Sequence, residues 1–137
     1  MNSFETQIRV EYHHTDQMGI VHHSNYVKFF EVARTEWLRA AGLTYAEMER
    51  RGVMMPIVEV QVKYRQPAYY DELITVRAEV SELPMARMTF RYEIRGEDGR
   101  DIVSGLTTLG FIDKETRRPQ RAPQWLMEVL KRELNIE

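Results

Sequence analysis

The strongest constraint on the fold is a series of alternating apolar and polar residues in the second half of the chain. A period of two is typical of β-strands, and regular polar positions indicate that only one face of each strand is covered. Such strands pair most readily in an antiparallel sheet. The Gly96–Gly99 turn joins the last two into a hairpin, and Gly105 and Gly110 mark bulges in the final one. The four predicted strands span residues 58–65, 74–80, 88–94 and 102–113.

Before these strands the pattern changes to that of one long amphipathic helix. From about Ser24 to Ala41, apolar residues recur every three or four positions and charged residues fill the other face. Ser24 or Asn25 can cap the start of this helix. Gly42 stands where a left-handed residue commonly ends a helix.

Shorter elements complete the chain. Alternation over residues 6–12 predicts a first strand, and Thr44 with Glu47 predicts a short helix that ends near residue 51. Pro123 opens a C-terminal helix with a stripe of leucine and valine. The sequence therefore predicts one α+β domain over residues 1–137, with a five-stranded antiparallel sheet wrapped around one long central helix.

Composition excludes several classes of function. The 137 residues are enough for one domain with a single core, and 19 basic against 21 acidic residues argue against a nucleic-acid binder. There is no cysteine, which excludes disulfides, a thiol nucleophile and thiolate zinc sites. The first residues lack a signal-peptide pattern, and no apolar run approaches the roughly 20 residues of a membrane span. We therefore expect a soluble cytoplasmic protein.

The segment from Tyr12 to Tyr26 carries the candidate chemistry. It holds all four histidines of the chain, together with Asp16 and Gly19, directly before the long helix. A helix N-terminus presents unpaired N–H donors to an oxygen or an anion. An aspartate in a turn before glycine also has a purely structural use, because its side chain bonds nearby backbone N–H groups. The residue pattern alone leaves both roles open.

One spaced motif runs through this segment and into the helix, and its members are Tyr12, Asp16, Gly19, Val21, His23, Tyr26, Phe30, Glu31, Ala33 and Arg34. With this motif, the chain from about residue 8 to about residue 134 resembles the hotdog-fold acyl-CoA thioesterases related to 4-hydroxybenzoyl-CoA thioesterase. The most similar branch is the one found with the bacterial Tol–Pal cell-envelope genes. The hotdog fold has the layout that the strand and helix patterns predict.

The resemblance implies hydrolysis of acyl-CoA to a carboxylic acid and free CoA, without a metal or cofactor. Asp16 matches the catalytic carboxylate, which attacks the thioester carbonyl or deprotonates a water. The backbone N–H of His23 matches an oxyanion donor, and the side chains of His23 and Tyr12 match groups that line the site. A local hydrogen bond for His23 and a core position for Tyr12 are the structural alternatives. An acyl-CoA sensor without turnover and, more weakly, a dehydratase are the functional ones.

The resemblance also implies partners. Relatives bind the CoA phosphates with basic residues in the turn that here spans 83–87, where only Arg87 is basic. The substrate is acyl-CoA, or an acyl carrier protein thioester, and the unpaired edge of the sheet predicts a homodimer or homotetramer. Other residues could contact the nucleotide or line an acyl pocket, although surface and core roles explain them equally well: Lys63, Arg65, Arg117, Arg118 and Arg121, and Phe30, Trp37, Met54 and Met55.

Two further clusters are assigned structural roles. His13 and His14 are adjacent, and adjacent residues on a strand point to opposite faces, so we predict no metal site there; His22 is placed with them at the rim. Glu31 and Arg34 are one turn apart and predict an ion pair on the solvated face of the helix.

Overall fold

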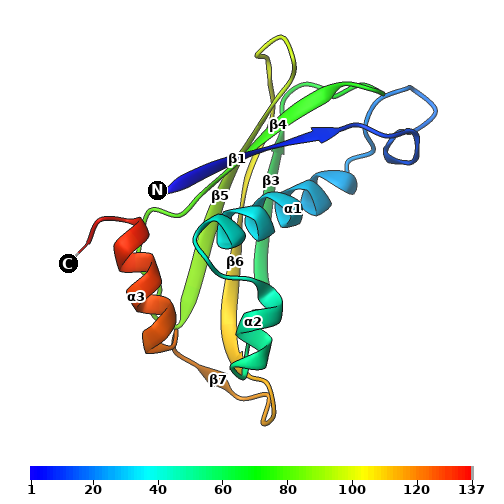
Figure 1. Cartoon of the computed structure of the whole chain (residues 1–137). Coiled ribbons are helices and arrows are strands. Elements are labelled where there is room, and N and C mark those ends of the chain that lie inside the picture. The colour runs from blue at the N-terminus through cyan, green and yellow to red at the C-terminus, as the bar shows by residue number, and fades with distance from the viewer. Residues whose placement is uncertain (137) are drawn as a thin grey trace.

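The computed structural model describes residues 1–136, which form a curved antiparallel sheet with helices against it (Figure 1). The long strands follow one another across the sheet in the order β1-β4-β5-β6-β3. The predicted five-stranded antiparallel sheet is confirmed, and two short strands, β2 (Val53–Met54) and β7 (Pro119–Gln120), pair with β6. The long strands are β1 (Ser3–Arg9), β3 (Ile57–Tyr64), β4 (Leu73–Glu79), β5 (Arg87–Arg95) and β6 (Asp101–Asp113).

Three α-helices occur within the described residues, at the predicted places: α1 (Asn25–Ala40), α2 (Tyr45–Arg50) and α3 (Gln124–Glu133). The hydroxyl of Thr44 accepts the Glu47 N–H at 3.1 Å, and Gly42 has a φ of +90°, so Thr44 and Gly42 act as predicted. The α1 helix has 16 residues and α3 has 10, so α1 is not the only helix of substantial length. The fold is a mixed α and β domain.

The core lies between α1 and the inner face of the sheet. The ring of Phe30 stacks on Tyr92 with centroids 4.3 Å apart, and Trp37 meets Phe90 edge-on at 5.8 Å. Gly105 lies opposite Tyr92 in regular register, so the predicted bulge at this glycine is wrong. A Cβ atom at Gly105 would lie 2.8 Å from the Phe30 ring, and the glycine therefore provides space for that ring.

Strand β3 differs from its neighbours because its apolar side chains are uncovered. Along β5, buried and exposed residues alternate over the whole strand. Along β3 every residue except Val62 is exposed, and the side chains of Val58, Val60 and Tyr64 remain 51%, 38% and 53% accessible. Among the described strands β3 pairs only with β6, so its other side is an open edge.

The first strand ends at Arg9, so the prediction that it reaches Tyr12 is wrong. The chain turns instead into a short 3₁₀ helix, η1 (Tyr12–His14). Local side chains provide alternative partners for the backbone here: the Glu11 N–H donates to Nδ1 of His14 at 2.9 Å, and the Thr15 hydroxyl donates to the Tyr12 carbonyl at 2.8 Å. These bonds compete with strand pairing and explain the early end.

A search of the described residues finds no helix that is both long and apolar enough to cross a membrane.

Candidate functional site

Asp16 lies in a tight turn between η1 and α1. Its backbone N–H donates to Ile20 at 2.9 Å, and Gly19 closes the turn with a φ of +75°, a conformation that favours glycine. One carboxylate oxygen, Oδ1, accepts the Met18 N–H at 2.8 Å. The second oxygen has no hydrogen-bond partner among residues 1–136. The carboxylate thus supports the turn with one oxygen and leaves the other available for chemistry.

A network of backbone bonds fixes this turn against the start of α1. The His14 carbonyl accepts both the His22 N–H, at 2.9 Å, and the side-chain amide of the buried Asn25, at 2.8 Å. The Val21 N–H donates to Ala68 at 2.9 Å. As a result, the turn is held beside the helix N-terminus, where the helix dipole favours negative charge.

Asp16 and His23 line the same cavity, of about 390 Å³, at the N-terminal end of α1. This volume is within the range of small-ligand pockets. The rest of the wall is mainly apolar and comes from the Asp16 turn, the helix start and the segment after β3: Met18, Ile20, Val21, Tyr26, Tyr64, Arg65, Gln66 and Pro67. The cavity therefore combines a carboxylate, a helix terminus and an apolar lining.

His23 lies at the entry to α1, one residue before the Ser24 cap position. Its backbone N–H has no hydrogen-bond partner among the described residues, which is what an oxyanion donor requires. Its carbonyl is the acceptor for a long 3.5 Å bond from the Tyr64 hydroxyl. The Ser24 side chain bonds to His22 and does not cap the helix, so the predicted capping by its hydroxyl is wrong and the helix mouth stays open.

Tyr12 and Arg87 do not join this cavity within one chain. Tyr12 is 81% exposed and meets Tyr70 edge-on at 5.8 Å, which excludes the alternative of a core tyrosine. Arg87 pairs in register with Gly110, whereas the cavity lies beyond Tyr64 at the other end of β3. At about 3.3 Å per residue, these ends are roughly 20 Å apart. One protomer alone does not bring Arg87 to Asp16.

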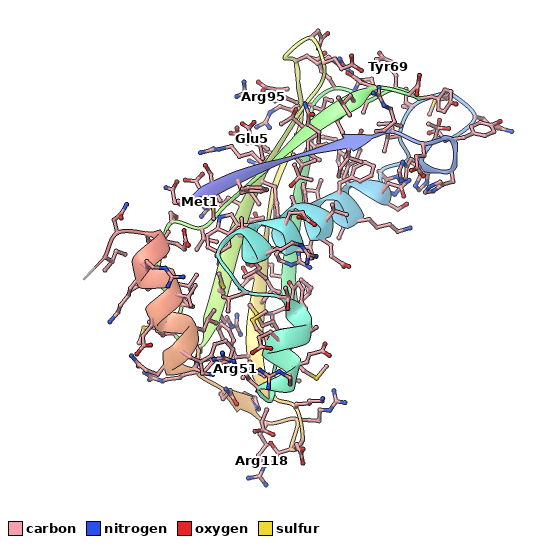
Figure 2. The ribbon with its side chains drawn as sticks, viewed as in Figure 1. Met1, Glu5, Arg51, Tyr69, Arg95 and Arg118 are labelled. Atoms are coloured by element: carbon pink, nitrogen blue, oxygen red, sulfur yellow. The ribbon has the colours of Figure 1, made fainter. Side chains whose placement is uncertain are left out.

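Figure 2 shows the two ends of the molecule through its labelled residues. Tyr69, whose backbone bridges to Ile20 of the turn, lies at the end where α1 begins. Arg118 lies at the opposite end, beyond α2. Met54 and Met55 line a separate cavity of about 210 Å³ beside α2, whereas Phe30 and Trp37 are fully buried core residues.

The predicted solvent-exposed ion pair between Glu31 and Arg34 is wrong in its setting. Arg34 is only 5% exposed, and its guanidinium donates to the Tyr45 hydroxyl at 2.8 Å and to the Tyr92 hydroxyl at 3.2 Å. The Glu31 carboxylate is 3.9 Å away and exposed. Burial raises the pKa of both phenols despite the opposing effect of Arg34, so both stay protonated at neutral pH and accept the Arg34 bonds as neutral hydroxyls. Arg34 fastens α1 and α2 to the sheet.

His13 and His14 do not point to opposite faces as predicted, because the two residues lie on η1 and not on a strand. Their rings are 4.1 Å apart between centroids, and Nε2 of His13 lies 2.6 Å from the Glu11 carboxylate. His22 is apart from this group and bonds to the Ser24 hydroxyl at 2.8 Å.

Tyr26 and Tyr64 both line the Asp16 cavity, although the sequence predicted a site role for neither. Tyr64 is 41 residues from His23 in sequence, and the structure brings the two together at the end of β3. The alternation of β3 indicated which face Tyr64 occupies. The alternation did not indicate that this face meets the N-terminal end of α1.

Comparisons with known proteins show the family of the chain. The model of the thioesterase-like superfamily matches residues 10–130. YneP of Bacillus subtilis is 31% identical over 129 residues, which are 91% of this chain and 94% of that protein. The acyl-CoA thioesterase YbgC of Haemophilus influenzae is 35% identical over 94 residues, or 68% of this chain and 69% of that protein.

A solved structure shows the same architecture. The DHNA-CoA thioesterase of Staphylococcus aureus superposes with a TM-score of 0.88 at 33% identity, and the match covers 98% of this chain and 94% of that one. The superfamily model, the sequence relatives and the shared architecture lead to one conclusion: the chain belongs to the thioesterase-like superfamily.

Proposed function

We propose that this protein is an acyl-CoA thioesterase that hydrolyses the thioester to a carboxylic acid and free CoA. The observation that carries the proposal is the cavity that Asp16 and His23 both line, since the His23 N–H has no hydrogen-bond partner among residues 1–136. The named relatives support the substrate class, since acyl-CoA thioesterases of the same superfamily align with most of the chain.

The chemistry follows from these two groups. The thioester carbonyl accepts a hydrogen bond from the His23 N–H, and the positive end of α1 stabilises the negative charge that develops on its oxygen. Asp16 either takes a proton from a water that attacks the carbonyl carbon, or attacks it directly through Oδ2. The carbon–sulfur bond breaks and the CoA thiolate leaves and is protonated. In the direct route, water then hydrolyses the acyl-aspartyl anhydride and restores the carboxylate.

The uncovered β3 surface supports a homodimer with the hotdog arrangement, in which the joined sheets wrap the α1 helices. Val58, Val60 and Tyr64 form an exposed apolar stripe next to an open strand edge, and such edges are paired or covered in native proteins. A twofold axis at this edge pairs β3 with β3 of a second copy, because an isologous interface uses one patch twice. Pairing of two dimers gives the tetramer.

The dimer also resolves the separation of Arg87 from Asp16. In an antiparallel β3 pair, the Tyr64 end of one strand lies beside the Ile57 end of the other. The cavity of one subunit then faces the Arg87 end of its partner, together with the Met54 and Met55 region. We infer that Asp16 and His23 come from one chain, whereas CoA and acyl contacts come from both. Tyr12, beside Tyr70, contributes to the outer wall.

The delivery of substrate by an acyl carrier protein, the cytoplasmic location and the Tol–Pal branch stay predictions. An aromatic acyl group is worth testing first, because the Staphylococcus aureus relative is a DHNA-CoA thioesterase.

The test is a panel assay of thiol release from short-chain, long-chain and aromatic acyl-CoAs, with binding measured in parallel by calorimetry. We expect turnover of at least one class. Binding without thiol release across the panel would instead identify a sensor and overturn the proposal.

A further inference from the structure

Glu11, His13 and His14 form a group of potential ligands that thioester hydrolysis does not use. One donor atom from each residue lies within 4.8 Å of the others. We propose that this group binds one transition-metal ion of borderline softness, such as Zn²⁺ or Ni²⁺, on the turn that precedes Asp16. The site stands apart from the proposed hydrolase activity and does not depend on it.

The backbone of η1 creates the arrangement. Its three-residue turn brings His13 and His14 to the same side, with their rings tilted by 55° at a centroid separation of 4.1 Å. The Glu11 carboxylate lies 2.6 Å from Nε2 of His13. Two donors that each lie about 2.0–2.2 Å from a zinc ion are within roughly 4.4 Å of each other. Small side-chain rotations are therefore enough to place all three around one ion.

His14 is held in place before any ion binds. It is half-buried, and its ring meets the edge of Phe29 on α1 at 4.9 Å. Its carbonyl anchors His22 and Asn25, so its backbone is fixed as well.

The donor set indicates the kind of ion. Two imidazoles and one carboxylate suit zinc, nickel, cobalt or copper, whereas magnesium and calcium prefer oxygen ligands. Three protein ligands leave a fourth position for water. Binding replaces the hydrogen bond between Glu11 and His13, and it also breaks the bond from the Glu11 N–H to Nδ1 of His14.

The surroundings separate this site from the thioesterase cavity. Glu11, His13 and His14 line a cavity of about 360 Å³ that shares no lining residue with the Asp16 cavity. Lys28 of α1 lines the same cavity as the histidines, and its charge acts on His14. Lys28 repels a cation in this cavity and weakens its binding. Replacement of Lys28 by a neutral residue should therefore strengthen metal binding.

The experiment is calorimetric titration of the 137-residue chain with zinc chloride, after chelator treatment and removal of the chelator. We expect one zinc ion per chain. His13→Ala should weaken binding by more than about tenfold, since even outer-shell partners of a metal contribute 10- to 100-fold. The matched control is His22→Ala, a histidine of the same segment outside the group, and it should bind zinc as the wild type does. Lys28→Gln should bind more tightly.

The melting temperature, measured with and without zinc, shows whether a variant that binds no zinc is still folded. Zinc should raise the melting temperature of the wild type and of His22→Ala, but not that of Glu11→Gln. The proposal is overturned by the absence of saturable zinc binding to the wild type. It is equally overturned if His13→Ala and Glu11→Gln bind like the wild type, or if magnesium binds as tightly as zinc. Thiol release is measured with and without EDTA, and unchanged turnover keeps the metal site distinct from the thioesterase site.

Discussion

Strands β5 and β3 have the same alternating sequence pattern but reach different states in the folded chain. On β5, Phe90 and Tyr92 are buried against α1, whereas the matching positions of β3, Val60 and Val62, belong to a strand that is exposed almost throughout. We call the β5 side the covered side, because its inward side chains are buried within one chain. We call the β3 side the uncovered side, because most of its side chains are exposed. The Asp16 cavity lies on that side, beside Tyr64. Alternation predicts which side chains share a face, but not whether the same chain covers that face.

The largest effect is expected on the stability of the covered side. Phe90→Ala removes a fully buried ring that packs on Trp37, and it should lower the free energy of unfolding by about 3–5 kcal/mol. Arg91→Ala, on the exposed face of the same strand, is the matched control and should change it by less than about 0.5 kcal/mol. Urea unfolding followed by circular dichroism measures both. Equal losses would contradict the assignment of inner and outer faces.

On the uncovered side, the largest effect should be on catalysis and not on stability. Asp16→Asn keeps the shape and the Oδ1 bond to Met18, but an amide is neither a base nor a nucleophile. Turnover should fall at least ~10²-fold, with acyl-CoA binding and melting temperature nearly unchanged. Steady-state thiol release and calorimetry separate these quantities. Turnover near the wild-type value would remove Asp16 from the mechanism.

A charge on β3 tests the proposed dimer. Val60→Lys places two like charges near the proposed twofold axis, where they cost several kcal/mol. Light scattering over a dilution series should show a folded monomer, and thiol release should be lost with the dimer. Thr89→Lys, on the exposed face of β5, should leave the assembly intact. A wild-type monomer of 16.3 kDa with full activity would rule out the shared site.

His23→Ala should have a smaller effect, because the proposed oxyanion contact uses its backbone. We expect a loss of about tenfold in turnover, at the low end for removal of one positioned group. The measurement is thiol release for this variant and for Asp16→Asn at the same substrate concentration. A loss as large as that of Asp16→Asn would show that the imidazole takes part directly.

Most of the fold could be predicted because it depends on local signals. The alternation of β4 and β5, the Thr44 cap and the left-handed Gly42 are each decided by residues within a few positions. The pairing of Asp16 with the start of α1 was also local, since 15 residues hold both.

The remaining features depend on competition that the sequence pattern does not show. Strand β1 stops at Arg9 because Glu11 and His14 offer the backbone hydrogen bonds that a strand partner would otherwise provide. Arg34 is on the charged side of the helical pattern, yet Tyr45 and Tyr92, from distant segments, bury it. The place of Tyr64 in the cavity depends on how α1 crosses the sheet, which periodicity does not determine.

The smallest effect concerns the loss of stability in acid, and it should appear on the covered side of the molecule. Glu72 is nearly buried and accepts hydrogen bonds from Arg100, at 2.6 Å, and from the backbone of Tyr69 and Glu97. Burial raises the pKa of Glu72, but these donors outweigh burial, and the net pKa is lower than its usual value of 4.5. The unfolded chain therefore takes up this proton first as the pH falls. The stabilisation, on the order of 1 kcal/mol, is present above pH 4.5 and is lost as the pH drops through the folded pKa. Unfolding measured from pH 7 to pH 3 should show a smaller acid dependence for Glu72→Gln than for the wild type, and identical profiles would show that this carboxylate does not link the β4 end to the β5–β6 hairpin.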